Sequence, residues 1–254
     1  MPMNGCDTQI FTGAFDDDTL VSVDPETRRA EDGTLCYKIL AKKYSHWSLD
    51  GNGTVIMETD TTYKVKDGWY GYTREFTGKD TAFIVMDPWI DCSDPVLNDY
   101  FGKNCEGFTL PLMQAAAAAG HHIIVMTNDP GKIKFNTRIT PGLEDLAAVG
   151  RADVIYHQNH TPETFYAYLG QKNITNLIYT GYCSNMCVMF RPMGIVRMKE
   201  FENLKFYFVP QCAMAMEHAE TWETRSVHRY TTLNIAQLHA GLLSYEDLMN
   251  AFTM

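Results

Sequence analysis

The sequence predicts an α/β protein whose mostly parallel sheet is covered by helices on both faces, preceded by an N-terminal β-hairpin extension. Three observations lead to this prediction. From residue 81 onward the apolar runs are continuous, as in strands that are buried on both faces. Helical segments separate these runs, which is typical of βαβ units. Before residue 80, short β-like runs and turn residues replace that alternation.

The N-terminal arm, residues 1–79, is expected to contain hairpins. Residues 1–35 are polar and predict loops, and β-like runs follow at residues 36–41, 53–59 and 62–65. The intervening Asp50-Gly51-Asn52-Gly53 combines residue types that favour tight hairpin turns. We expect one or two antiparallel hairpins here, before a main α/β domain over residues 80–254.

Strands and helices alternate in this main domain. The buried strands are expected at residues 81–86, 122–126, 153–156, 176–180 and 206–210. The helices are expected at residues 111–119, 141–149, 162–171, 186–199 and 217–238, with Pro192 interrupting the fourth. Right-handed crossovers between parallel strands then place helices on both faces of the sheet.

Composition and charge exclude several classes of protein. The chain has 254 residues and a formal net charge of -10, which argues against a nucleic-acid binder with a basic face. No run reaches the ~18 apolar residues of a membrane span, and the first residues lack the features of a secretory signal. Seven irregularly spaced cysteines then predict a cytoplasmic protein with reduced thiols and no structural zinc.

Two residues beyond the ends of predicted strands carry the candidate chemistry. Ligands of open α/β sheets bind outside the carboxyl ends of the strands. Asp87 directly follows the first strand, and Cys187 lies in a strand–turn–helix passage after the fourth. A helix start lowers a thiol pKa and offers N–H groups to an oxyanion, and a nearby carboxylate can act as general base. We therefore predict a hydrolase with Cys187 as nucleophile and Asp87 as base.

The run Thr180-Gly181-Tyr182-Cys183-Ser184-Asn185-Met186-Cys187-Val188, together with Asp87, resembles the isochorismatase-like cysteine hydrolases. These include nicotinamidases, N-carbamoylsarcosine and ureidoacrylate amidohydrolases, and biuret hydrolase. The resemblance covers roughly residues 80–250. It implies a three-layer fold, a homo-oligomer (dimer or tetramer) and an acyl-enzyme formed on Cys187. It also implies a cis peptide between Tyr182 and Cys183, with the backbone N–H groups of Cys183 and Cys187 forming an oxyanion hole.

The chain departs from the family pattern at one position. The family's third catalytic residue is a lysine just after the third strand, and here Gln158 stands in that place. Lys132 or Lys134, from the loop after the second strand, could supply the missing cation instead. His157 or His160 could also supply it. In the remaining alternative, the protein is a catalytically weak or inactive member that binds a ligand or serves in assembly.

The resemblance also implies the kind of substrate, a small amide or ureido-type compound. Five residues are candidates for binding it: Trp89, Gln158, His160, Tyr182 and Asn185. Arg191 could bind a substrate carboxylate, although pairing with an acid in the helix bundle is the favoured interpretation. No cofactor is expected. No metal is expected either, because the loop at Asp129 lacks the nearby histidines of metal-binding relatives.

Overall fold

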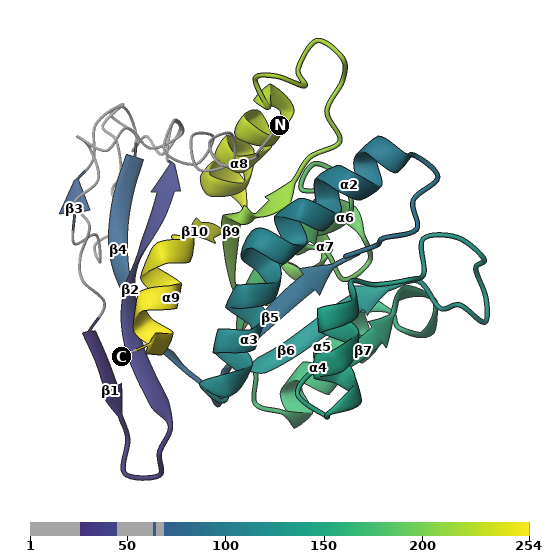
Figure 1. The fold of residues 1–254 in the computed structure, drawn as a ribbon. Coiled ribbons are helices and arrows are strands. Elements are labelled where there is room, and N and C mark those ends of the chain that lie inside the picture. The colour runs from purple at the N-terminus through teal and green to yellow at the C-terminus, as the bar shows by residue number, and fades with distance from the viewer. Residues whose placement is uncertain (1–25, 45–62, 65–68, 254) are drawn as a thin grey trace.

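One sheet runs through the part of the chain that the computed structural model describes, residues 26–44, 63–64 and 69–253. Its ten strands follow the order β3-β4-β2-β10-β9-β8-β5-β6-β7, with β1 paired to β2 (Figure 1). The parallel strands include all five that the sequence predicts: β5 (Thr81–Met86), β6 (His122–Thr127), β7 (Asp153–Tyr156), β8 (Asn176–Tyr182) and β9 (Lys205–Met214). The predicted α/β class with a mostly parallel sheet is confirmed.

Helices cover both faces of this sheet because the side chains of its strands alternate between two hydrophobic clusters. Phe83 and Val85 of β5 belong to the first cluster, and Ile84 and Met86 belong to the second. The first cluster includes residues of α2 (Pro95–Asn104), the π-helix η2 (Cys105–Thr109), α3 (Leu110–Ala118), α4 (Pro141–Ala148) and α9 (Tyr245–Thr253). The second includes residues of α5 (Pro162–Gln171), α6 (Cys187–Phe190), α7 (Ile195–Met198) and α8 (Ser226–Leu238).

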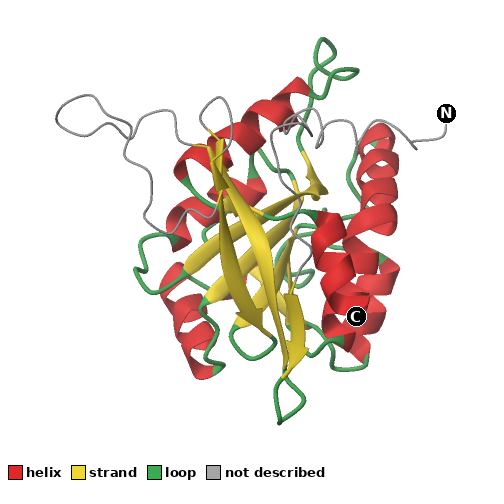
Figure 2. Cartoon of the chain, turned by 90° about the vertical axis from the view of Figure 1, so that its left-hand side faces the viewer, coloured by secondary structure: helices red, strands yellow, loops and turns green. Residues whose placement is uncertain are grey.

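The N-terminal strands extend the same sheet in antiparallel fashion. They are β1 (Glu26–Arg29), β2 (Leu35–Tyr44), β3 (Tyr63–Lys64) and β4 (Trp69–Thr77). The short β10 (Gly241–Leu242) joins the two halves, since it pairs parallel with β9 and antiparallel with β2. Figure 2 shows these strands with helices on both sides of the sheet. The run predicted at 53–59 and its turn lie outside the described residues, and the domain boundary at residue 80 stays a prediction.

Two predicted helices are shorter than their patterns suggest. The helix expected over 217–238 begins only at Ser226, because Arg225 has a left-handed φ of 52° and ends any preceding helical path. The Glu217 carboxylate instead accepts the N–H groups of Val227 and His228 at the start of α8. The helix expected over 186–199 is divided into α6 and α7, with Pro192 between them.

Candidate active site

The first site residue, Asp87, lies at the carboxyl end of β5, which is hydrogen-bonded to β8 on one side and to β6 on the other. Its φ is 46°, and its residue surface is 1% exposed. Met86 is in register with Gly181 of β8, so the run that holds Cys187 begins directly beside Asp87. The topology therefore brings the two sequence-predicted residues to one edge of the sheet.

Gly181 of the same run is required by geometry. Its φ is 99°, in the region that L side chains rarely adopt. A Cβ built at this position would lie 2.1 Å from the carbonyl oxygen of Met86. Only glycine therefore lets β8 approach the Met86 backbone so closely at this point, just before the residues around Cys187.

Cys187 is the first residue of α6, and its thiol meets Asp87. The Tyr182–Cys183 peptide is cis, as the resemblance implied, and the Cys183 backbone N–H favours the Cys187 thiolate. Burial, followed by the charge of Asp87 and the hydrogen bond to it, raises the Cys187 pKa to about 12, although Arg191 opposes the shift. The lowered thiol pKa predicted from the helix start is wrong, since α6 is one short turn and burial outweighs it.

The Asp87 carboxylate is held between two nitrogen donors. His157 Nε2 lies 2.7 Å from Asp87 Oδ1, and Arg191 Nε lies 3.0 Å from Asp87 Oδ2. Among the side chains considered from the sequence as replacements for the lysine, His157 is thus the one in contact with Asp87. Lys132 Nζ donates to the Gln158 carbonyl and to Asn159 Oδ1 instead. Lys134 is exposed and has no hydrogen bond or ion pair among the described residues.

Arg191 is the site residue whose place sequence reasoning missed. A continuous helix would put it one turn after Cys187, on the helix surface. The residue before a proline is restricted to extended backbone, however, and Arg191 has φ -55° and ψ 157° before Pro192. The chain leaves the helix there, and the guanidinium contacts Asp87 as well as the Cys187 sulfur. Pro192 was the signal that could have indicated this departure.

A short hydrogen-bond network supports Arg191 from the neighbouring strand ends. Gln158 accepts the Asp129 N–H through Oε1 at 2.7 Å and donates through Nε2 to Asn128 Oδ1 at 2.9 Å. The same Asn128 oxygen accepts Arg191 Nη2 at 3.5 Å. Gln158 therefore contacts the site through Asn128 and makes no direct contact with Asp87.

The other predicted substrate-binding residues have different surroundings. Trp89 donates from Nε1 to Thr127, and the Arg191 guanidinium lies 5.6 Å from the centre of its ring, so Trp89 borders the site. Tyr182 is 1% exposed, and its ring stacks on that of Phe101. Tyr182 is therefore part of the hydrophobic core and does not line a pocket.

Asn185 and His160 complete the set. Asn185 bonds the backbone N–H and carbonyl of Met216 with its side-chain amide, which ties the loop after β9 to the segment before Cys187. His160 is half-buried, and its Nδ1 has no hydrogen-bond partner among the described residues. The structure therefore brings neither side chain into contact with Asp87.

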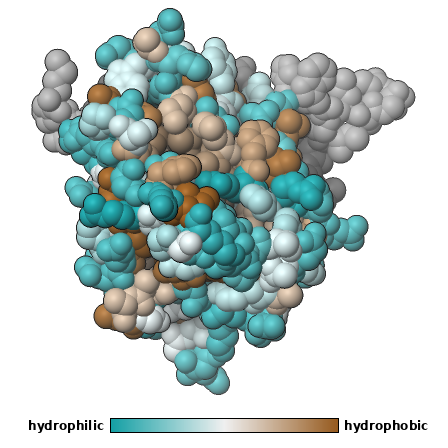
Figure 3. Space-filling model, turned by 90° about the vertical axis from the view of Figure 1, so that its right-hand side faces the viewer, coloured by the Kyte–Doolittle hydropathy of each residue, from teal (hydrophilic) through white to brown (hydrophobic). Residues whose placement is uncertain are grey.

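The face that carries these loops combines hydrophilic and apolar residues (Figure 3). Met186 and Phe190, on either side of Cys187 in sequence, are 48% and 62% exposed. Among the described residues, no group of three or more His, Cys, Asp or Glu side chains could hold a metal ion. In the same ranges, no helix is long and apolar enough to cross a membrane.

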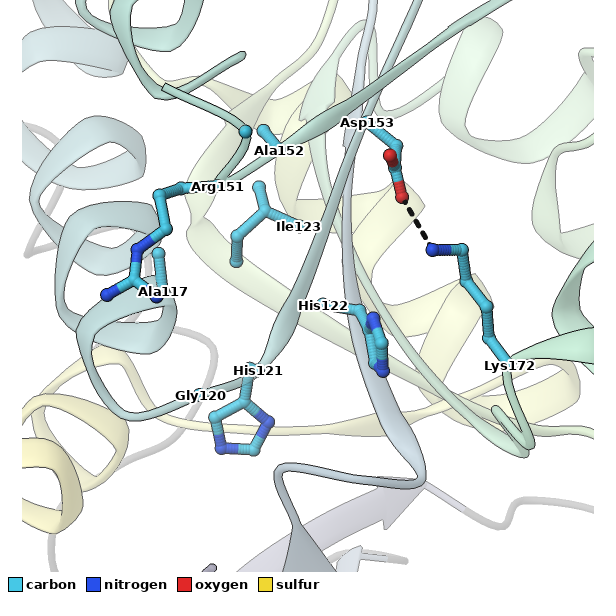
Figure 4. Close-up of a pocket in the computed structure, with 10 residues that line it drawn as sticks. Ala117, Gly120, His121, His122, Ile123, Arg151, Ala152, Asp153 and Lys172 are labelled. Carbon is cyan, nitrogen blue, oxygen red and sulfur yellow. Dashed lines mark ion pairs between the residues drawn. The ribbon is translucent and has the colours of Figure 1, made fainter. Parts of the chain in front are cut away.

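A cavity of about 190 Å³ lies at the opposite edge of the sheet. His122 and Asp153, the first residues of β6 and β7, line it. Figure 4 shows the Lys172 ammonium directed toward Asp153, with Arg151 on the other side of the view. Because β5, β6 and β7 are parallel and Asp87 follows the far end of β5, this cavity lies apart from the candidate active site.

Comparisons with known proteins agree with this architecture. No protein-family model and no curated protein matches the sequence. A cysteine hydrolase structure from Pseudomonas syringae pv. phaseolicola is 16% identical, with a TM-score of 0.51 over 70% of this chain and 94% of that chain. An isochorismatase structure from Pseudomonas putida is 17% identical, with a TM-score of 0.52 over 66% and 89%. The chain therefore has the isochorismatase-like fold, which confirms the fold that its sequence resemblance implied.

Proposed function

We propose that this chain is an isochorismatase-like cysteine hydrolase that cleaves a C–N bond in a small amide or ureido-type compound. The observation that carries the proposal is the contact between the Cys187 thiol and the buried Asp87 carboxylate, with the Cys183 N–H at the same sulfur. Nucleophile, base and oxyanion donor are the three parts that acyl transfer through a thiol requires.

The reaction begins with loss of the thiol proton. Asp87 takes this proton as the Cys187 sulfur attacks the carbonyl carbon of the substrate. The N–H groups of Cys183 and Cys187 stabilise the oxyanion that forms; among the described residues, no backbone acceptor competes for the Cys187 N–H. Asp87 then returns the proton to the leaving nitrogen, and the C–N bond breaks to release ammonia or an amine. Water hydrolyses the thioester, with Asp87 again as base, and the free thiol is regenerated.

The raised thiol pKa fits this role for Asp87. Because burial and the neighbouring Asp87 charge raise its pKa, the Cys187 thiol stays protonated in neutral solution. Spontaneous ionisation therefore contributes little, and the proton must move to a base during the attack. A carboxylate in contact with the thiol meets that need.

The test is a comparison of two cysteine variants. We expect Cys187→Ala to lower ammonia release from a panel of amides and ureides by about 10³-fold or more, because the nucleophile is lost. Cys36→Ala is the matched control, since Cys36 is also a free cysteine but lies on β2, outside the candidate site. Equal turnover by wild type and Cys187→Ala on a compound that is hydrolysed would refute the proposal.

A second candidate function follows from Gln158. Because a glutamine replaces the family lysine, the chain is alternatively a catalytically weak or inactive member that binds a ligand or takes part in assembly. The two candidates differ in covalent chemistry. Incubation with p-nitrophenyl acetate and rapid acid quenching should add one acetyl group to Cys187 if the site performs acyl transfer. Absence of that adduct, together with no ammonia release from the panel, would favour the second candidate.

Three earlier predictions belong with this proposal. Trp89 is the best supported of the predicted substrate contacts, because it borders Arg191 and is only partly buried. Association into a dimer or tetramer is a prediction, as is a cytoplasmic location. Neither is needed for the chemistry proposed for Cys187 and Asp87.

A further inference from the structure

We propose that Arg191 supplies the positive charge for the Asp87–Cys187 pair, that His157 is a neutral hydrogen-bond donor, and that Gln158 positions Arg191 through Asn128. This assignment deepens the proposed function, because it takes Cys187 as the nucleophile. Arg191, in the turn after α6, would then supply the charge that the lysine supplies in the family, from a different part of the fold.

The surroundings of His157 indicate that its ring is uncharged. Nε2 lies 2.7 Å from Asp87 Oδ1, so this nitrogen carries the hydrogen that the carboxylate accepts. Nδ1 is buried and has no hydrogen-bond partner among the described residues. A doubly protonated ring would bury an N–H at Nδ1 without an acceptor, whereas the neutral tautomer leaves only a lone pair unmatched there. His157 therefore donates to Asp87 without adding a charge.

Arg191 has the opposite character. A guanidinium keeps its proton at any pH at which the protein is folded. Its Nε bonds Asp87 Oδ2 at 3.0 Å, and it also contacts the Cys187 sulfur. The side chain is 27% exposed, so water screens its charge only partly. Arg191 is thus the positive group that contacts both the base and the nucleophile, and it favours the thiolate that forms during attack.

Gln158 explains why Arg191 stays in this position. Its amide must accept from the Asp129 N–H and donate to Asn128 Oδ1, which a lysine could not do because an ammonium has no acceptor. Those two bonds fix the Asn128 oxygen toward Arg191 Nη2. The glutamine that departs from the family pattern therefore serves the relocated charge.

The titratable and charged groups around the Cys187 thiol come from four parts of the fold. Asp87 faces it after β5, and Cys183 lies after β8. Arg191 faces it after α6. His157, after β7, influences the thiol through its hydrogen bond to Asp87. Cys92, in the same β5–α2 loop as Asp87, influences it through Asp87 and Cys183. Among these groups, the geometry leaves Arg191 as the one with a permanent positive charge.

The test measures alkylation of Cys187 by iodoacetamide between pH 7 and pH 10.5, followed by peptide mass spectrometry. Removal of a positive charge in contact with a thiol raises the thiol pKa by about one unit or more, while the intrinsic nucleophilicity of the thiolate rises less. We expect Arg191→Gln to react about threefold more slowly than wild type at each pH. Arg191→Lys should recover part of the rate, and His157→Gln should remain within about twofold of wild type.

Two further variants complete the design. Arg197→Gln is the matched control, because Arg197 lies on α7 and pairs with the exposed Glu200. Gln158→Leu should slow alkylation by less than Arg191→Gln and should have no further effect when Arg191 is already glutamine. If Arg191→Gln fails to fold, as judged by circular dichroism, Gln158→Leu and Arg191→Lys still test the assignment.

Several results would overturn it. A folded Arg191→Gln that reacts at the wild-type rate would show that Arg191 does not supply the positive charge. A folded His157→Gln that slows as much as Arg191→Gln would assign the charge to His157 instead. An unchanged rate in Gln158→Leu would remove the positioning role. Since no amide is turned over in this experiment, its outcome is separate from the failure or success of the proposed hydrolase activity.

Discussion

Two carboxylates at opposite ends of the parallel strands have cationic neighbours, but only one of them is buried. Asp87, beyond the end of β5, has a side chain that is 0% exposed, between His157 at 3% and Arg191 at 27%. Asp153, at the start of β7, is 48% exposed and lies 3.2 Å from Lys172. Water screens the second pair, which is worth about 0–1 kcal/mol. The buried Asp87 carboxylate, by contrast, is stabilised by its protein partners and not by water, which is typical of charged groups in active sites.

The largest effect should come from breaking the buried group. Asp87→Ala leaves the Arg191 guanidinium without its carboxylate in a mostly buried position. We expect the free energy of unfolding to fall by about 3–5 kcal/mol, as for other buried ion pairs that lose one partner. Urea unfolding at pH 7 measures this quantity.

The matched control for that variant is Asp153→Ala at the other end of the sheet. It removes the ion pair with Lys172 and the hydrogen bond from Tyr168, both on the surface, and should cost about 1 kcal/mol. Losses of similar size in the two variants would contradict the contrast between the buried and the exposed carboxylate.

Two glycines extend the comparison between the two ends of the parallel strands, Gly181 near Asp87 and Gly150 near Asp153. Gly181→Ala combines a φ of 99° with a Cβ that would meet the Met86 backbone, so we expect a loss of about 3 kcal/mol or more. Gly150, before β7, has a φ of 71° but open space around its Cβ position, and Gly150→Ala should cost about 1 kcal/mol. Thermal unfolding followed by circular dichroism compares the two. A Gly181→Ala variant as stable as Gly150→Ala would disprove the close approach of β8 to β5.

The last prediction concerns the pH dependence of stability and His121. This histidine is buried directly before β6, near the amino-terminal ends of the parallel strands. Burial among the rings of Tyr37, Phe83 and Phe252 lowers its pKa to about 4. Because the folded pKa lies below the unfolded value of 6.5, its contribution to stability is present above pH 6.5 and is lost as the pH falls toward 4. The loss at pH 5 is about 2 kcal/mol.

His121→Phe should remove that acid sensitivity. The difference in unfolding free energy between pH 7 and pH 5, from urea titrations, should shrink by about 2 kcal/mol in this variant. His228, whose pKa is also lowered to about 4, contributes equally to both proteins and cancels in the comparison. An unchanged difference would mean that His121 does not resist protonation in the folded state.

The sequence was sufficient to bring Asp87 and Cys187 together because both follow strands that pair side by side. Strand ends of a parallel sheet meet at one edge, so a pattern of apolar runs carries that information. The cations were harder to predict. Whether His157 or Gln158 faces Asp87 depends on the turn of η3 (His157–Asn159), and the place of Arg191 depends on the break at Pro192. Both depend on the local backbone conformation of a turn, which periodicity does not encode.

Elements with weak patterns also escaped prediction. The sequence of β4 contains a glycine and several polar residues among its aromatic ones. In α2, polar and apolar residues are interspersed, and only three residues are buried. The two residues of β10 are too short for any periodicity to appear, and their pairing is fixed by contacts with β2 and β9. Such segments take their structure from tertiary contacts and not from local preference.

The position of β10 has a consequence for the order of events during synthesis. Lys42 of β2 pairs with Leu242 of β10, 200 positions later in the chain. At about 5–20 residues per second, a ribosome needs on the order of 10–40 s to make the intervening chain. Throughout that interval one edge of β2 lacks its β10 partner, and it offers backbone groups to any strand that it meets. We therefore expect the two halves of the sheet to be joined only after Leu242 has left the ribosome.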